Sequence, residues 1–224
     1  MDSTISGIAR SLHADVDALD LISQNVANMQ TPGYLSKHVA RSFEAGLADS
    51  TVLNLASGAL KRTAQPLDVA VQGDAFFTVA AGDQTLLTRN GQFHVNSQGQ
   101  LVTAEGYPVL GTSGPIAVSS PNIRILSDGS VEDAGKVVDR LHIVTIGDPR
   151  KLSDVGNDLY AYGDAVATWQ GAVVTGALEQ ANVDPGNEMV HLIETTRHAQ
   201  SLQHAMQAYD EALQTGINHL GDNN

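Results

Sequence analysis

Residues 1–34 read MDSTISGIARSLHADVDALDLISQNVANMQTPGY, and this stretch carries a hydrophobic repeat of seven residues. A second apolar row lies three residues C-terminal to the first, and it is interrupted only at Asp15. This spacing is typical of a helix that packs against another helix along a narrow seam. The predicted N-terminal seam consists of Ile5, Ile8, Leu12, Leu19, Ile22, Val26 and Met29. Because each such side chain contributes about 1.5–3 kcal/mol when fully buried, the helix requires a partner.

The C-terminal end of the chain shows the same seven-residue interval. The predicted C-terminal seam consists of Leu192, Leu202, Met206, Tyr209, Leu213 and Leu220, with Ala199 in the same row. We therefore predict two terminal helices that pack as a coiled coil.

The N-terminal helix is expected to begin at a cap on Ser3 or Thr4 and to run to about Met29. The tripeptide Thr31-Pro32-Gly33 should stop it, since proline cannot extend the hydrogen-bond ladder and glycine readily adopts turn conformations. Polar side chains in the last turns can bond a neighbouring helix or the outgoing chain. These are Ser23, Gln24, Asn25 and Asn28.

The middle of the chain alternates short apolar runs with turn signals. Residues 35–66 are expected to form an extended connector with one short helix or strand. Residues 67–178 contain Gly82-Asp83, Asn90-Gly91 and Asp128-Gly129, of which Asn-Gly is the strongest hairpin signal. The predicted fold is mainly β with α-helical termini: an antiparallel β domain (67–178) inserted between an N-terminal helix (1–34) and a C-terminal helix (179–224).

Composition limits the function classes. The net charge is −13, with only 12 Lys and Arg, which argues against nucleic-acid binding. The chain has no cysteine, which excludes disulfides, thiolate metal sites and cysteine nucleophiles. No cleavable signal peptide and no apolar run near 18 residues is visible, so neither signal cleavage nor membrane insertion is expected.

Residues that suggest chemistry do not form a recognised site. His191, Glu194 and His198 share a helix, but a metal centre needs about three convergent ligands, so we predict no metal. Asp15, Asp17 and Asp20 are interpreted as carboxylates that provide solubility or a charge repulsion that discourages premature association. No phosphate-binding loop and no nucleophile elbow is present, so we predict no catalytic residue, no cofactor and no small-molecule ligand.

Three segments together resemble the bacterial flagellar rod and hook protein family. The sequence SQNVANMQTPGY (23–34) resembles the family's N-terminal signature, in which Asn-x-Ala-Asn precedes Thr-Pro-Gly and an aromatic residue. Residues 67–77, 88–93 and 99–111 resemble its core β segment, and residues 178–184 with 188–197 resemble its C-terminal signature. The motif positions are Asn25, Ala27, Asn28, Thr31, Pro32, Gly33, Tyr34, Asn182 and Val183.

Within this family the chain is most similar to proximal-rod proteins, because of its short length and the run Gln65-Pro66-Leu67-Asp68-Val69-Ala70. Distal-rod proteins are the nearest alternative, and hook proteins usually carry an additional outer domain. The chain departs from the family after Arg197, where an aromatic and an acidic residue usually follow, and at Pro185-Gly186.

The resemblance implies a structural subunit of the flagellar basal-body rod, exported through the flagellar type III apparatus and assembled in the periplasm. Its implied partners are other axial rod and hook proteins and further copies of itself, joined through the terminal seams. The motif residues would fix the exit of the first helix and the entry to the last. Two hypotheses from other classes stay open: a secreted β-domain hydrolase with a helical stalk, and a soluble adaptor with an intramolecular coiled coil.

Overall fold

The computed structural model describes residues 2–40, 50–120 and 122–221, which divide into two compact units. The helical unit contains the described residues 2–27, 37–40, 50–51 and 184–221. The β unit contains residues 28–36, 52–120 and 122–183. The prediction of a mainly β chain with a helix near each end is confirmed.

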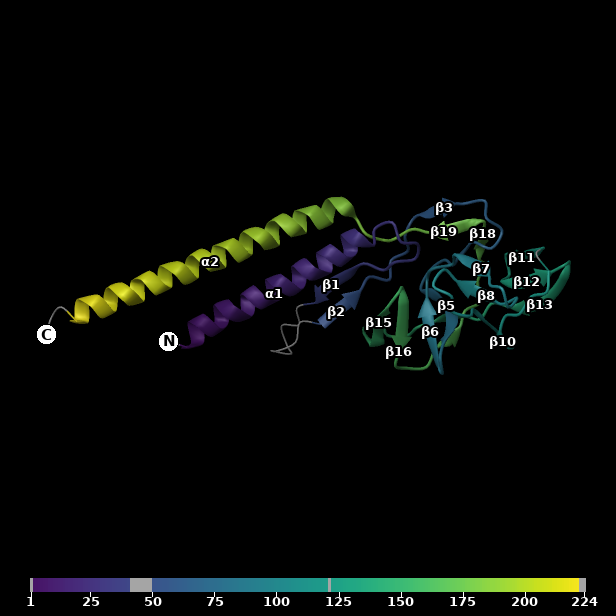
Figure 1. The fold of residues 1–224 in the computed structure, drawn as a ribbon, viewed down its shortest axis with the longest axis horizontal. Helices are drawn as coiled ribbons and strands as arrows, with labels where there is room; N and C mark the ends of the chain where they lie inside the picture. The colour runs from purple at the N-terminus through teal and green to yellow at the C-terminus, as the bar shows by residue number, and fades with distance from the viewer. Residues whose placement is uncertain (1, 41–49, 121, 222–224) are drawn as a thin grey trace. The chain divides into compact units, whose positions relative to one another are not determined.

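In the helical unit, α1 (Asp2–Ala27) lies beside α2 (Pro185–Gly221), and the two helices run in opposite directions (Figure 1). The strand β1 (Lys37–Ala40) contacts α1 and pairs with β2 (Ser50–Leu53), whose first two residues belong to this unit.

The start of α2 is capped. The Oδ1 atom of Asp184 accepts hydrogen bonds from the backbone N–H groups of Gly186 at 2.9 Å and Asn187 at 3.3 Å. Pro185 occupies the first helical position, where its missing N–H leaves no bond unmade.

The largest sheet of the β unit has six antiparallel strands in the order β15-β16-β6-β5-β14-β17. They are β5 (Ala75–Ala81), β6 (Gln84–Thr88), β14 (Ile143–Thr145), β15 (Leu152–Gly156), β16 (Leu159–Tyr162) and β17 (Ala167–Thr168). The short 3-10 helix η1 (Pro149–Lys151) precedes β15.

Smaller antiparallel sheets complete the unit. One has three strands: β11 (Ile123–Ile125), β12 (Ser130–Asp133) and β13 (Lys136–Arg140). The others are pairs: β3 (Leu60–Arg62) with β19 (Ala177–Glu179), β4 (Val69–Ala70) with β18 (Val174–Thr175), β7 (Phe93–Val95) with β8 (Leu101–Thr103), and β9 (Leu110–Gly111) with β10 (Gly114–Pro115).

Strand β5 separates two hydrophobic clusters. Phe77 and Val79 belong to the larger cluster, whereas Phe76 packs with Leu35 and Tyr160 in the smaller one. Successive strand residues point to opposite faces, so the adjacent phenylalanines serve both clusters. The segment that leaves α1 thus contributes Leu35 to the core of the β unit.

Three details differ from the sequence prediction. The helix α1 ends at Ala27 rather than near Met29. The described part of residues 35–66 contains three strands rather than one short element. Asn90-Gly91 does not close a hairpin, because β7 pairs with β8 and the Gly91 carbonyl accepts a hydrogen bond from Val69 N–H at 3.0 Å. A Cβ at Gly91 would lie 1.7 Å from the Val69 carbonyl oxygen, so glycine permits this close approach.

Candidate assembly interface

One residue of the predicted N-terminal seam, Ile22, lies beside residues of α2. Ile22 is buried, and a small cavity of about 190 Å³ is lined by Ala18 and Ile22 of α1 together with Glu188 and Thr195 of α2. Of the remaining seam positions, Ile8, Leu12, Leu19 and Val26 are half-buried, Ile5 is exposed, and Met29 lies exposed in the turn beyond the helix.

The predicted C-terminal seam is less covered. Leu202 and Tyr209 are half-buried, while Leu192 and Met206 are exposed. The side chains of Leu213 and Leu220 lie outside the described residues.

A second apolar surface lies at the beginning of α2. Met189, Val190 and Ile193 are 56%, 52% and 47% exposed. Met189, Val190 and Ile193 lie about 100°, 160° and 140° around the helix from the buried Glu188, at about 100° per residue. These three residues, called the outer patch below, therefore point away from α1.

Asp15 occupies the interrupted position of the N-terminal seam, and its interpretation as a solubilising carboxylate was wrong. It is only 3% exposed, and its Oδ1 and Oδ2 atoms lie 2.9 and 2.8 Å from Nδ1 of His198 on α2. No pattern in the sequence indicates this contact, because the two residues are 183 positions apart.

Asn25 joins α1 to two other segments of the helical unit. Its Nδ2 donates to Oε1 of Glu188 at 3.0 Å and to the backbone carbonyl of Lys37 at 2.9 Å, while its Oδ1 accepts from Lys37 N–H at 2.9 Å. Asn25 and Glu188 are both buried. The asparagine thereby holds the start of β1 and the first turn of α2 against the same end of α1.

The other motif residues lie in or next to the β unit. Ala27 is the exposed last residue of α1, and the Thr31 hydroxyl donates to Asn28 Oδ1 at 3.3 Å. Pro32 is half-buried and Tyr34 is buried. Gly33 has a φ of +73° and donates its N–H to the Glu179 carbonyl at 2.8 Å, so this turn is fixed directly to β19.

Asn182 binds three backbone groups. Its Oδ1 accepts from Ser36 N–H at 2.6 Å, and its Nδ2 donates to the carbonyls of Asn54 and Ala56, both at 2.7 Å. Val183, the next motif residue, is half-buried. The side chain of Asn182 thus holds three segments of the β unit together, immediately before α2.

Sequence reasoning did not single out Arg89 or Glu179, which form a buried ion pair in the β unit. Besides Glu179, the guanidinium donates to the carbonyls of Leu55 at 3.2 Å and Gly73 at 2.8 Å. Burial raises the pKa of the Glu179 carboxyl above its ordinary value, and the Arg89 charge opposes that shift.

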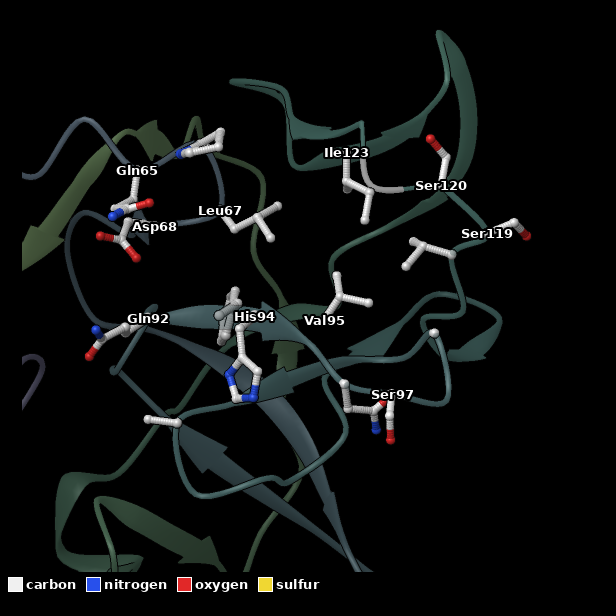
Figure 2. Close-up of a pocket in the computed structure, with 16 residues that line it drawn as sticks. Gln65, Leu67, Asp68, Gln92, His94, Val95, Ser97, Ser119, Ser120 and Ile123 are labelled. Carbon is white, nitrogen blue, oxygen red and sulfur yellow. The ribbon is translucent and has the colours of Figure 1, made fainter.

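A cavity of about 730 Å³ also opens in the β unit. Figure 2 shows Leu67, Val95 and Ile123 facing its space. Asp68 and His94 are the titratable side chains among its described lining residues.

Within the described ranges, no group of three or more His, Asp or Glu side chains is placed to hold a metal ion. No helix in that part of the chain is long and apolar enough to cross a membrane.

Comparisons with known proteins relate both units to flagellar proteins. Residues 70–138 match the flagellar hook protein FlgE/F/G D1 domain, and residues 174–219 match the flagellar basal body rod FlgEFG protein C-terminal family. The flagellar basal-body rod protein FlgG of Bacillus subtilis is 32% identical over 243 positions, covering 89% of this chain and 92% of that protein. This chain belongs to the flagellar basal-body rod protein family.

Relatives of this rod protein include both FlgF and FlgG. The FlgF proteins of Mesorhizobium japonicum and Rhizobium meliloti are 28% and 29% identical, covering 88% and 91% of this chain and 90% and 91% of their own lengths. The resemblance in the sequence is therefore confirmed at the level of the family, and the rod protein is a structural component of the flagellar basal body that serves motility.

Proposed function

We propose that this chain is a FlgF-like subunit of the proximal rod, which assembles with axial relatives and with copies of itself through α1 and α2. The outer patch carries this proposal. It exposes three large apolar side chains on a helix whose opposite side already contacts α1. Covering such a patch is favourable by about 25 cal/mol per Å² of apolar surface, which gives assembly a driving force.

In the proposed rod, α1 and α2 of each subunit pack as a coiled coil along the two seams. The half-buried seam residues and the outer patch then contact neighbouring subunits. Contacts between two different surfaces generate a helical assembly when the rotation between neighbours does not close a ring. The role is structural and requires no catalytic residue, cofactor or bound metal.

The proposed location is the periplasmic rod, reached through the flagellar type III export apparatus without signal cleavage. The proposed partners are this apparatus and the adjoining axial proteins. Family membership supports association with flagellar components. The acidic net charge of −13 supports the absence of a nucleic-acid role.

The FlgF assignment is supported by the lengths of the alignments. The match to FlgG of Bacillus subtilis needs 243 positions to cover 89% of this chain, so it contains many residues of the relative that this chain lacks. The match to FlgF of Mesorhizobium japonicum covers 88% of this chain in 225 positions, so it needs fewer insertions for nearly the same coverage. Labelling the chain and locating it along isolated basal bodies tests the assignment: a distal position would support the FlgG alternative instead.

The variant Ile193→Asp tests assembly through the outer patch. It places a charge on an exposed surface, so the monomer should keep its helical signal and its β unit while losing the ability to form rods and support swimming. Ser201→Asp adds the same charge at an exposed position of α2 outside the patch and should leave assembly intact. Normal assembly and swimming of Ile193→Asp would refute the proposed interface.

A further inference from the structure

Two polar pairs join α1 to α2. Asp15 lies within 2.9 Å of His198, and Asn25 donates to Glu188 at 3.0 Å. Asp15, Asn25 and Glu188 are 3%, 1% and 4% exposed. Polar groups buried this deeply destabilise a helix interface unless each finds a hydrogen-bond partner.

The spacing of the two pairs matches one antiparallel alignment. Asn25 follows Asp15 by ten residues on α1, and His198 follows Glu188 by ten residues on α2. Ten helical residues span about 15 Å on each helix, so both pairs close together in this alignment.

The apolar seams do not determine this alignment by themselves. Both repeat every seven residues, so a slide of seven residues, about 10 Å, again brings apolar positions opposite each other. Selection between such alignments requires groups that are penalised when they are mismatched.

A slide in one direction breaks both pairs. It would bring Ala205 opposite Asp15 and Thr195 opposite Asn25. The Asp15 carboxylate would then be buried beside a methyl group, and removal of the partner of a buried charge is strongly destabilising.

A slide in the other direction shows why the second pair is needed. It would bring His191 opposite Asp15, so a histidine would again be available to the carboxylate. Asn25, however, would pass the beginning of α2 at Pro185 and lose its contact with Glu188.

We propose that Asp15–His198 and Asn25–Glu188 form a register lock, a specificity-determining device that makes α1 and α2 pair in a single antiparallel alignment. A helix without matching polar side chains would leave Asp15 buried and unpaired, so the lock also selects which helix α1 accepts. The inference concerns the pairing of α1 with α2, and it stands whether or not the outer patch mediates rod assembly.

Disulfide trapping in the full chain measures the alignment, because the sequence contains no cysteine of its own. Ala18 and Thr195 line the same small cavity, so Ala18→Cys with Thr195→Cys reports the observed alignment. Ser11→Cys with Thr195→Cys, and Ala18→Cys with Leu202→Cys, report slides of seven residues in the two directions. A slide of about 10 Å exceeds the range of about 4.4–6.8 Å between the Cα atoms of a disulfide.

Among the three cysteine-pair variants that retain Asp15 and Glu188, only the Ala18–Thr195 pair should form a disulfide. The double variant Asp15→Leu with Glu188→Leu removes both polar pairs and leaves Asn25 bonded to Lys37. It should raise the yield of the two slid disulfides about tenfold or more, because apolar replacement of buried polar pairs retains packing but loses discrimination. Asp17→Leu with Glu194→Leu makes the same changes at exposed positions on the same helices and should leave the pattern unchanged.

Two results would overturn the proposal. If the Asp15→Leu, Glu188→Leu variant remains helical and still forms only the Ala18–Thr195 disulfide, apolar packing alone sets the register. If its helical circular dichroism signal is lost, the polar pairs are required for folding rather than for alignment. Disulfides that join two chains are distinguished by mass from those within one chain. Each is then scored for the residue pair that it joins.

Discussion

Arg89 and Glu179 form a bidentate ion pair inside the β unit, although they are 90 residues apart. Nε of Arg89 donates to Oε2 of Glu179 at 3.1 Å, and Nη2 donates to Oε1 at 3.0 Å. The same guanidinium lies 5.6 Å from the centroid of the Phe76 ring. The pair therefore connects the end of β6, the strand β5 and the last strand before α2.

Glu179→Gln should strongly destabilise the β unit, because it leaves a guanidinium that is 1% exposed without a counter-charge. Breaking such a buried pair costs about 3–5 kcal/mol. Denaturant unfolding followed by near-ultraviolet circular dichroism measures the loss. Lys151→Met breaks the exposed pair between Lys151 and Asp164, and it should change the unfolding free energy very little. Equal effects of the two variants would show that burial does not govern the Arg89–Glu179 pair.

Gly33→Ala should be more destabilising than Gly82→Ala. Both glycines have positive φ values, +73° and +62°, where any other L-residue costs about 1–2 kcal/mol. Only at Gly33 would the new Cβ also meet backbone, 2.4 Å from the carbonyl carbon of Arg89. Gly82 has no atom within 4 Å of that position.

The difference in unfolding free energy between the two variants measures the cost of close packing at Gly33. Equal destabilisation by both would mean that the turn after α1 shifts freely away from Arg89.

The fold class could be predicted from the sequence because its signals are local. Heptad spacing marks the terminal helices, and Gly82-Asp83 marks the turn between β5 and β6, where Ala81 pairs with Gln84. Pairings such as β3 with β19 could not be predicted, since strands of three residues contain no periodic pattern. The hairpin predicted at Asn90-Gly91 does not form, because the long-range contact between Gly91 and Val69 outweighs the local turn preference.

The candidate interface could be predicted only in its apolar part. The burial of Ile22 follows from the seven-residue periodicity of the sequence. The burial of Asp15 could not be predicted, because its partner His198 belongs to the other end of the chain. Asn25 and Asn182 are identified by the family motif, but their hydrogen-bond partners follow only from the fold. Nothing local distinguishes Arg89 from a solvated arginine.

Tyr160 should make stability fall at alkaline pH. Burial raises the pKa of its hydroxyl above the ordinary value of 10.0. Below pH 10 the hydroxyl is neutral in both states, so its contribution is fully present. Above pH 10 the unfolded chain loses the proton while the folded chain retains it, and the contribution declines by up to about 1.4 kcal/mol per pH unit.

The Tyr160→Phe variant isolates this effect. It removes the hydroxyl that accepts a hydrogen bond from Leu35 N–H at 3.4 Å, so it should be less stable by about 1 kcal/mol at neutral pH. The difference between parent and variant should shrink as the pH rises above 10. Denaturant unfolding at a series of pH values tests this, and a constant difference from pH 8 to pH 11 would contradict it.

Asn182→Asp should destabilise the β unit although the two side chains have the same shape. The amide nitrogen donates to the carbonyls of Asn54 and Ala56, whereas a carboxylate places an acceptor against two acceptors. Losing both bonds and adding repulsion should cost about 1–3 kcal/mol, because each hydrogen bond contributes about 0.5–1.5 kcal/mol. Asn187→Asp is the matched control, since the Asn187 amide lies exposed at the start of α2 and binds only the Asp184 side chain. Denaturant unfolding of the β unit should report a loss of stability for Asn182→Asp and none for Asn187→Asp, because Asn187 belongs to the helical unit. An Asn182→Asp protein as stable as the parent would show that the three segments around Asn182 hold together without its amide.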